Sequence, residues 1–179
     1  MEEREFWEIV DAAHAAGTRH EDSFEGRREA LASRLRALEP DRVQAFAQLF
    51  LDRHHQANTW DLWAAAYLLG GGCSHDGFTD FRSWLISLGR SWFERAMKEP
   101  DSLADVQFGP HEEQDSFFEE YAYVAGDIFE ELTGESMPER PENAATEPAG
   151  EPWEDDDALA SRLPRLWEAS RGGRTSPDR

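Results

Sequence analysis

The stretch from Thr59 to Gly89 constrains the fold more than any other part of the chain, because it joins two apolar segments through three consecutive glycines. Nearly every residue from Leu62 to Leu69 is apolar or alanine, and a helix that is apolar on all sides belongs in the centre of a domain. The segment that begins near Ser74 or Asp76 repeats phenylalanine and leucine at helical spacing. We therefore predict two buried helices joined by a glycine turn.

Local signals mark the ends of both predicted helices. Thr59 is a suitable N-cap for the first, and Asp61 lies in its first turn, where a negative charge favours the helix dipole. The glycines at 70–72 permit the left-handed backbone of a tight connection. Ser74 or Asp76 would cap the second helix.

Helical periodicity extends through most of the remaining chain. Apolar residues recur every three or four positions from residue 2 to about 16, from 22 or 23 to 38, from 40 to the break at 58 and 59, and from 112 to 132. No stretch shows convincing β alternation. The predicted fold is all-α, with a single compact multi-helix domain of about six to eight helices.

The composition changes after Gly134. Residues 135–152 contain four prolines and few large apolar groups, which is typical of an extended connector. Apolar residues between Trp153 and Trp167 predict a C-terminal helix that docks on the body and is limited or restarted at Pro164. We expect four parts: a helical core at 1–134, the Pro-rich connector at 135–152, the docking helix at 153–170 and a disordered tail at 171–179.

The charge balance limits the partners of the chain. The 38 acidic and 18 basic residues give a net charge of -20, which repels phosphate backbones and argues against nucleic-acid binding. The longest apolar run is too short to span a bilayer, and the acidic N-terminus lacks the basic start of a secretory signal. We expect a cytoplasmic protein with no nucleic-acid or membrane partner. Its single cysteine, Cys73, excludes an internal disulfide.

The polar and aromatic residues of the central stretch form its only plausible chemical face. The candidate binding residues are Trp60, Asp61, His75, Asp76, Asp80, Arg82 and Trp84. Asp61 lies between two indoles, where a buried acid could serve as a general acid. The competing interpretation, which local capping favours, makes Asp61 a first-turn residue that bonds the backbone or an arginine such as Arg82.

Three of these residues, His75, Asp76 and Asp80, could together ligate a divalent metal, since the two aspartates share a helix face. Their spacing matches no zinc or EF-hand pattern. Capping by Asp76 and pairing of Asp80 with Arg82 or another arginine explain the same residues. The glycine turn could bind an anion but matches no Walker or dinucleotide loop, and Cys73 with His75 matches no nucleophile signature. We predict no metal, no cofactor and no catalytic residue.

The block WDLWAAAYLLGGGCSHDGFTDFRSWLISLGR, from Trp60 to Arg90, resembles the signature of an uncharacterised bacterial family catalogued as the domain of unknown function forty-two forty. The resemblance extends to the N-terminal Phe6-Trp7 pair, the turn at 101–104, the helix near Glu120 and the approach at 150–153. It implies a helical protein of a family common in actinobacteria and implies no reaction. His75 stands where many relatives are expected to carry an acid, which weakens a metal site there.

Two functions remain open from the sequence. The first is a protein-binding or regulatory interaction module whose partner has a basic face, because no catalytic set is complete. The alternative is a small-molecule-binding protein or an enzyme whose polar site, with or without a divalent metal, lies beside Asp61, Asp76, Asp80 and Arg82. That alternative requires a concave site in which at least two of these acids face one another. The oligomeric state is left open.

Overall fold

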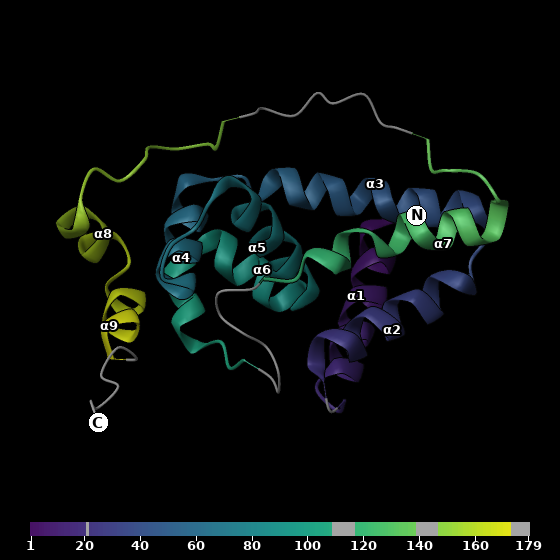
Figure 1. Ribbon diagram of the computed structural model, residues 1–179, viewed down its shortest axis with the longest axis horizontal. Coiled ribbons are helices and arrows are strands. Elements are labelled where there is room, and N and C mark those ends of the chain that lie inside the picture. Colours follow the sequence, from purple (N-terminus) through teal and green to yellow (C-terminus); the bar gives the residue numbers. More distant parts are fainter. Residues whose placement is uncertain (21, 109–116, 139–146, 173–179) are drawn as a thin grey trace.

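The computed structural model describes residues 1–20, 22–108, 117–138 and 147–172, which form nine α-helices and two 3-10 helices and contain no β-strand (Figure 1). The all-α prediction is confirmed. Residues 139–146 of the expected connector and residues 173–179 of the expected tail lie outside the described residues. In chain order the elements are α1 (Glu3–Gly17), α2 (Ser23–Arg36), α3 (Pro40–Gln56), α4 (Trp60–Gly70), α5 (His75–Ser87), α6 (Arg90–Lys98), η1 (Pro100–Asp105), η2 (Glu119–Ala122), α7 (Val124–Thr133), α8 (Asp156–Arg162) and α9 (Pro164–Gly172).

The central helix pair consists of α4 and α5. Thr59 Oγ1 accepts a hydrogen bond from the Leu62 amide at 3.2 Å, and Ser74 Oγ accepts one from the Gly77 amide at 3.1 Å, so a hydroxyl residue caps each helix. Gly71 follows α4 in the left-handed conformation, with φ at 66°, which residues with a side chain seldom adopt. The turn brings α5 back against α4, and their large apolar side chains are mostly buried.

Tyr67 departs from the prediction that α4 is buried on every side. Its side chain is 39% exposed, although Leu62 and Leu68 on the same helix are buried. The Tyr67 ring lies 5.5 Å from the ring of Trp153, which comes from the C-terminal part of the chain. A tyrosine tolerates this position because its apolar ring packs while its hydroxyl stays in water.

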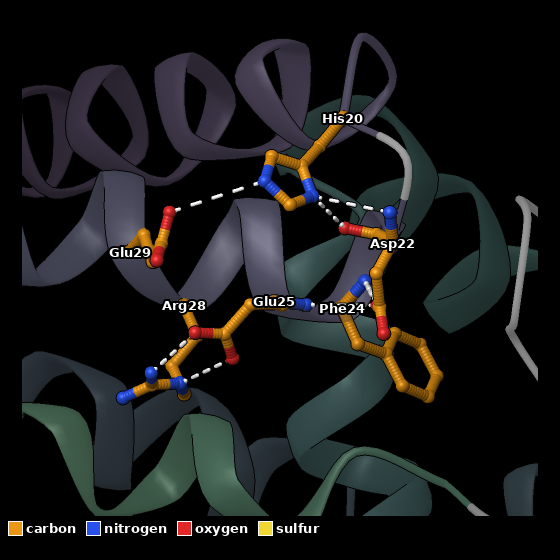
Figure 2. A network of polar contacts seen from close by, with 6 residues as sticks. All are labelled: His20, Asp22, Phe24, Glu25, Arg28 and Glu29. Atoms are coloured by element: carbon orange, nitrogen blue, oxygen red, sulfur yellow. Dashed lines mark hydrogen bonds and ion pairs between the residues drawn. The ribbon is translucent and has the colours of Figure 1, made fainter.

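The corner between α1 and α2 is held by polar contacts (Figure 2). Asp22 Oδ1 accepts hydrogen bonds from the amides of Phe24 and Glu25 at 3.0 and 3.1 Å, and it therefore caps α2. His20 Nδ1 accepts one from the Asp22 amide at 3.1 Å, and Arg28 Nε donates to Glu25 at 2.8 Å. These short-range bonds fix the direction in which α2 leaves α1, and both helices pack together over their length.

The helix predicted from 112 to 132 is wrong between residues 117 and 123. α7 starts only at Val124 and is preceded by η2, while residues 109–116 lie outside the described part of the chain. Its end agrees with the prediction, because Gly134 takes the left-handed conformation directly after Thr133.

Two adjacent phenylalanines explain why the helix cannot begin earlier. Phe117 packs against Trp84 with the ring centroids 5.6 Å apart, whereas Phe118 stacks on Phe24 at 4.4 Å. The backbone of Phe118 has φ -83° and ψ 77°, outside the helical range. This conformation lets neighbouring side chains enter different parts of the core, and the resulting burial outweighs helix propensity.

Residues 147–172, here called the C-terminal arm, lie against α4 and η1 (Figure 1). The arm first pairs with the N-terminal end of α4 through two backbone bonds of 2.9 Å, from the Trp60 amide to the Ala149 carbonyl and from the Ala149 amide to the Asn58 carbonyl. It then buries Leu159, Leu163 and Leu166 from α8 and α9. No helix in the described segments is long and apolar enough to cross a membrane.

Candidate functional site

A groove of about 550 Å³ lies between α3, α5, η2 and α7. The two helices α3 and α7 run antiparallel beside each other and form its long walls (Figure 1). Its lining is largely apolar and includes Phe46, Ala47, Phe50 and Tyr121. Ligand pockets commonly have such a volume and combine an apolar lining with a few polar groups. This cavity, the α3–α7 groove, has Asp80 in its wall and is therefore the candidate site.

His54 lies at the end of the groove nearest α5. Its side chain is only 9% exposed, and Nε2 donates a hydrogen bond to the Thr79 carbonyl oxygen at 3.0 Å. Burial, assisted by the charge of Arg82, lowers the pKa of His54 to about 4, although the bond to Thr79 opposes this shift. His54 is therefore neutral at pH 7 and contributes no positive charge to the groove.

Asp80 is a half-buried carboxylate on the α5 side of the groove. Burial raises its pKa to about 6, and the negative charges of Glu119, Asp76 and Glu120 add to the effect. Asp80 forms no ion pair with any described residue. Its charged form therefore lacks the compensation that a nearby cation would provide.

Three more carboxylates border the groove and are exposed to solvent: Glu119 on η2, and Asp127 and Glu130 on α7. The Tyr123 hydroxyl donates a hydrogen bond to Glu119 Oε1 at 2.7 Å. None of the three forms an ion pair within the described part of the chain, and the described lining includes no lysine or arginine. The groove therefore combines an apolar floor with a rim of four uncompensated acids.

Several acidic side chains elsewhere on the molecule have arginine partners. Glu131, next to Glu130 in sequence, pairs with Arg36 at 2.9 Å. Glu94 pairs with Arg90 at 2.7 Å, and Asp61 pairs with Arg162 at 3.2 Å. The acids around the groove form no ion pair with any described residue, as is also true of other exposed acids such as Asp76 and Glu168, so they are available to a ligand.

Arg82 points away from Asp80, although the two residues are separated by one position. Its guanidinium donates to the His54 carbonyl oxygen at 3.3 Å and to Thr79 Oγ1 at 3.1 Å, and it lies 4.9 Å above the Phe78 ring. Burial lowers the pKa of Arg82 to about 10, so it remains charged at pH 7. Arg82 therefore positions His54 and α5 instead of neutralising the groove.

Two other predicted site residues belong to the contact with the C-terminal arm. Asp61 pairs with Arg162 of α8, and the Trp60 ring meets the Trp153 ring edge to face at 6.0 Å. Trp60 also stacks on Trp63 at 5.1 Å. These residues hold the arm and are not brought together with Asp80.

The remaining predicted residues lie outside the groove. His75 packs edge-on against Trp63 at 4.7 Å, and Asp76 is exposed in the first turn of α5. Trp84 is fully buried and stacks on Phe108 at 5.5 Å, so it is a core residue. Of the seven candidates, only Asp80 lines the groove.

Cys73 lies near Asp80, and burial together with that charge raises the pKa of its thiol to about 11. A thiol with such a pKa is mostly protonated at pH 7 and is a poor nucleophile. Within the described residues, no group of three or more His, Cys, Asp or Glu side chains is arranged to hold a metal ion.

The sequence carries a signal for the α7 wall outside the central stretch from Thr59 to Gly89. Tyr123, Asp127 and Glu130 recur at positions i, i+4 and i+7, which places them on one helix face beside the buried Val124 and Ile128. No local pattern showed that this face would lie opposite α3.

The sequence model of a family described as "Protein of unknown function (DUF4240)" matches residues 1–131. The match includes all four carboxylates of the groove and ends before the C-terminal arm. No curated protein and no solved structure gives a significant match to the chain.

Proposed function

Since the chain belongs to the DUF4240 family, whose function is unknown, we propose its function from the α3–α7 groove: a binding module that receives an organic cation with an apolar body. The observation that carries this proposal is the rim of four carboxylates with no cationic partner among the described residues. The proposal keeps the small-molecule ligand of the second function expected from the sequence but not its site, because Asp80 lines the groove and neither Asp61 nor Asp76 faces it there.

Each part of the groove has a counterpart in such a ligand. The aromatic floor would bury its hydrocarbon part, which stabilises a complex in proportion to the apolar area removed from water. An ammonium or guanidinium group near Asp80 would relieve the repulsion between this residue and Glu119. The neutral His54, whose Nε2 hydrogen is already used by Thr79, adds no repulsion towards a cation. These features support binding without a chemical step, in a protein that we still expect to be cytoplasmic.

Three molecules with the same hydrocarbon chain test this proposal on the full-length protein: octylamine, octanol and octanoate. We expect octylamine to shift the amide NMR signals of α3, α7 and Asp80, octanol to do so more weakly, and octanoate to have no effect. Attraction to the acidic surface in general would instead shift signals over the whole molecule. Stronger binding of octanol or octanoate than of octylamine would contradict the proposal.

Two double variants that change the net charge equally distinguish binding in the groove from attraction to the acidic surface as a whole. Neutralising Asp80 and Glu119 together (Asp80→Asn, Glu119→Gln) should weaken octylamine binding roughly tenfold, as expected for losing about 1.4 kcal/mol of charge interaction. The control, Glu154→Gln with Glu168→Gln, changes the net charge equally at exposed positions. Equal weakening by both double variants would rule out a specific site.

A protein partner with a basic face is a second candidate. It is supported by two large side chains of the α7 region that remain exposed, Tyr123 at 55% and Leu132 at 39%. A partner segment with lysines beside leucines would cover both. Leu132 lies outside the groove lining, so replacing it by serine should then weaken the binding of a lysine- and leucine-rich peptide and leave octylamine binding unchanged. Equal binding of the peptide to both forms would contradict this candidate.

A further inference from the structure

The four carboxylates of the groove fall into two pairs. Asp80 on α5 and Glu119 on η2 form the near pair; their elements pack together, and the charge of Glu119 acts on Asp80. Asp127 and Glu130 form the far pair, one helical turn apart on α7. The far pair lies towards the C-terminal end of α7, which Figure 1 shows beside the N-terminal end of α3.

Helix geometry gives the spacing between these pairs. Tyr123, whose hydroxyl bonds Glu119, is four residues from Asp127 and seven from Glu130, which corresponds to about 6 and about 10 Å along the axis of α7. On the opposite wall, the lining residues of α3 run from Phe46 to His54, or about 12 Å. The groove is therefore elongated, with a carboxylate pair towards each end.

The lining between the two pairs suits hydrocarbon. Phe46, Ala47 and Phe50 contribute apolar surface from α3. Opposite them, Gly126 presents no side chain, and a Cβ placed there would meet no atom within 4 Å. A methylene chain would pass between the pairs without leaving a polar group of its own unsatisfied, whereas a second charge at mid-length would be desolvated without a partner.

We propose that the ligand of the α3–α7 groove is a linear aliphatic diamine, bound with one terminal ammonium at Asp80 and Glu119 and the other at Asp127 and Glu130. This inference rests on the proposed function, because it names the class of cation for the same site. The ligand carries two charges at a separation matched to the two carboxylate pairs. A cation with a single charged end would use only the near pair.

Three probes with the same eight-carbon chain test the inference by titration of the full-length protein: diaminooctane, octylamine and aminooctanoate. A second ammonium at the far pair should make diaminooctane bind about tenfold more tightly than octylamine, equivalent to about 1.4 kcal/mol. Aminooctanoate should bind more weakly than octylamine, because its carboxylate would face Asp127 and Glu130. The variant pair Asp127→Asn and Glu130→Gln should bring the affinity of diaminooctane close to that of octylamine, and should weaken octylamine much less than diaminooctane.

The same titrations distinguish failure of this inference from failure of the proposed function. If octylamine binds in the groove but the far-pair variant leaves the ratio of the two affinities unchanged, the diamine assignment is wrong and cation binding stands. If neither amine shifts the signals of the groove, the proposed function fails as well. Gly126→Leu leaves the charge unchanged and fills the groove, so it should weaken the binding of diaminooctane. Undiminished binding would place the ligand elsewhere.

Discussion

Asp80 has the least favourable environment for its charge among the acids of the groove. It is half-buried, the negative charges of Glu119, Asp76 and Glu120 further raise its pKa, and His54 in the same groove is neutral. Between pH values of about 4 and about 6 the folded state binds more protons at Asp80 than the unfolded state. The contribution of Asp80 to the free energy of unfolding therefore falls as the pH rises through this window.

Replacing Asp80 by asparagine removes that unfavourable charge. At pH 7 we expect Asp80→Asn to increase the free energy of unfolding by roughly 0.5 kcal/mol, a figure already reduced for solvent screening. Below a pH of about 4 the gain should vanish, because Asp80 is then protonated in both states. Urea unfolding at both pH values measures the difference, and the His54 contribution cancels between the two proteins. A variant that is less stable than the parent at pH 7 would contradict this account.

At the residue scale, local interactions were predictable and distant partners were not. Thr59 and Ser74 cap the helices that follow them, because capping depends on the backbone amides of the next three residues. The partner of Asp61 is Arg162, about a hundred positions away, and no local pattern could identify it. Asp80 was chosen for its spacing from Asp76, yet it borders the groove because α5 meets η2.

At the scale of elements, the crossing of α1 and α2 depends on a close approach at Gly17. A Cβ at this position would lie 2.5 Å from Arg27 Cγ and 2.7 Å from the Ser23 carbonyl oxygen, so the α2 backbone would have to move. We expect Gly17→Ala to lower the free energy of unfolding by roughly 1–3 kcal/mol, as overpacking does in other cores.

A glycine-to-alanine substitution in α7 should instead raise the free energy of unfolding. Gly126 lies inside the helix, and an added methyl group would meet no atom within 4 Å. Gly126→Ala should stabilise the protein by roughly 0.5–1 kcal/mol, because alanine favours the helix over the unfolded chain. Thermal and urea unfolding of both variants test the pair. Destabilisation by Gly126→Ala would show that the groove is narrower than described.

Element boundaries could be predicted only where tertiary packing does not oppose the local pattern. The glycines after α4 and α7 end both helices as expected. Phe117 and Phe118 fit a continuous helical stripe, but their burial against different helices breaks it. Whether the residues before α7 form a helix or a turn depends on their contacts with α2 and α5, and the periodicity of the sequence does not reveal those contacts.

At the scale of the whole molecule, the family match and the fold divide the chain at a similar place. The matched segment, 1–131, contains all four carboxylates of the groove, and the C-terminal arm packs on another side of it, against α4 and η1. The resemblance to this family, seen in the block around the three glycines, is confirmed. The groove itself could not be predicted, because its walls come from α3, α5 and α7 and the order in which helices pack is not visible in a periodic pattern.

Asp101 links the arm to the rest of the molecule, because its two carboxylate oxygens accept hydrogen bonds from the Arg165 and Leu166 amides at 3.1 and 2.9 Å. This carboxylate of η1 therefore acts as the N-cap of α9. Asp101→Ala should lower the free energy of opening the C-terminal arm by about 1 kcal/mol, so that amides of α8 and α9 exchange hydrogen roughly five times faster. Asp101→Asn should restore only part of the protection, since its side-chain amide has one acceptor oxygen where the carboxylate uses two.

The exchange pattern over the chain then shows whether the arm opens as a separate unit. Its apolar contacts involve Leu159, Leu163 and Leu166, and α5 lies in the core beneath other helices. With Asp101→Ala we expect faster exchange in the arm and unchanged exchange in α5, because local opening does not require the core to unfold. The control Glu168→Ala, an exposed position on α9, should alter neither. Equal acceleration in the arm and in α5 would mean that the arm and the core unfold together, and that the arm is an integral part of the domain.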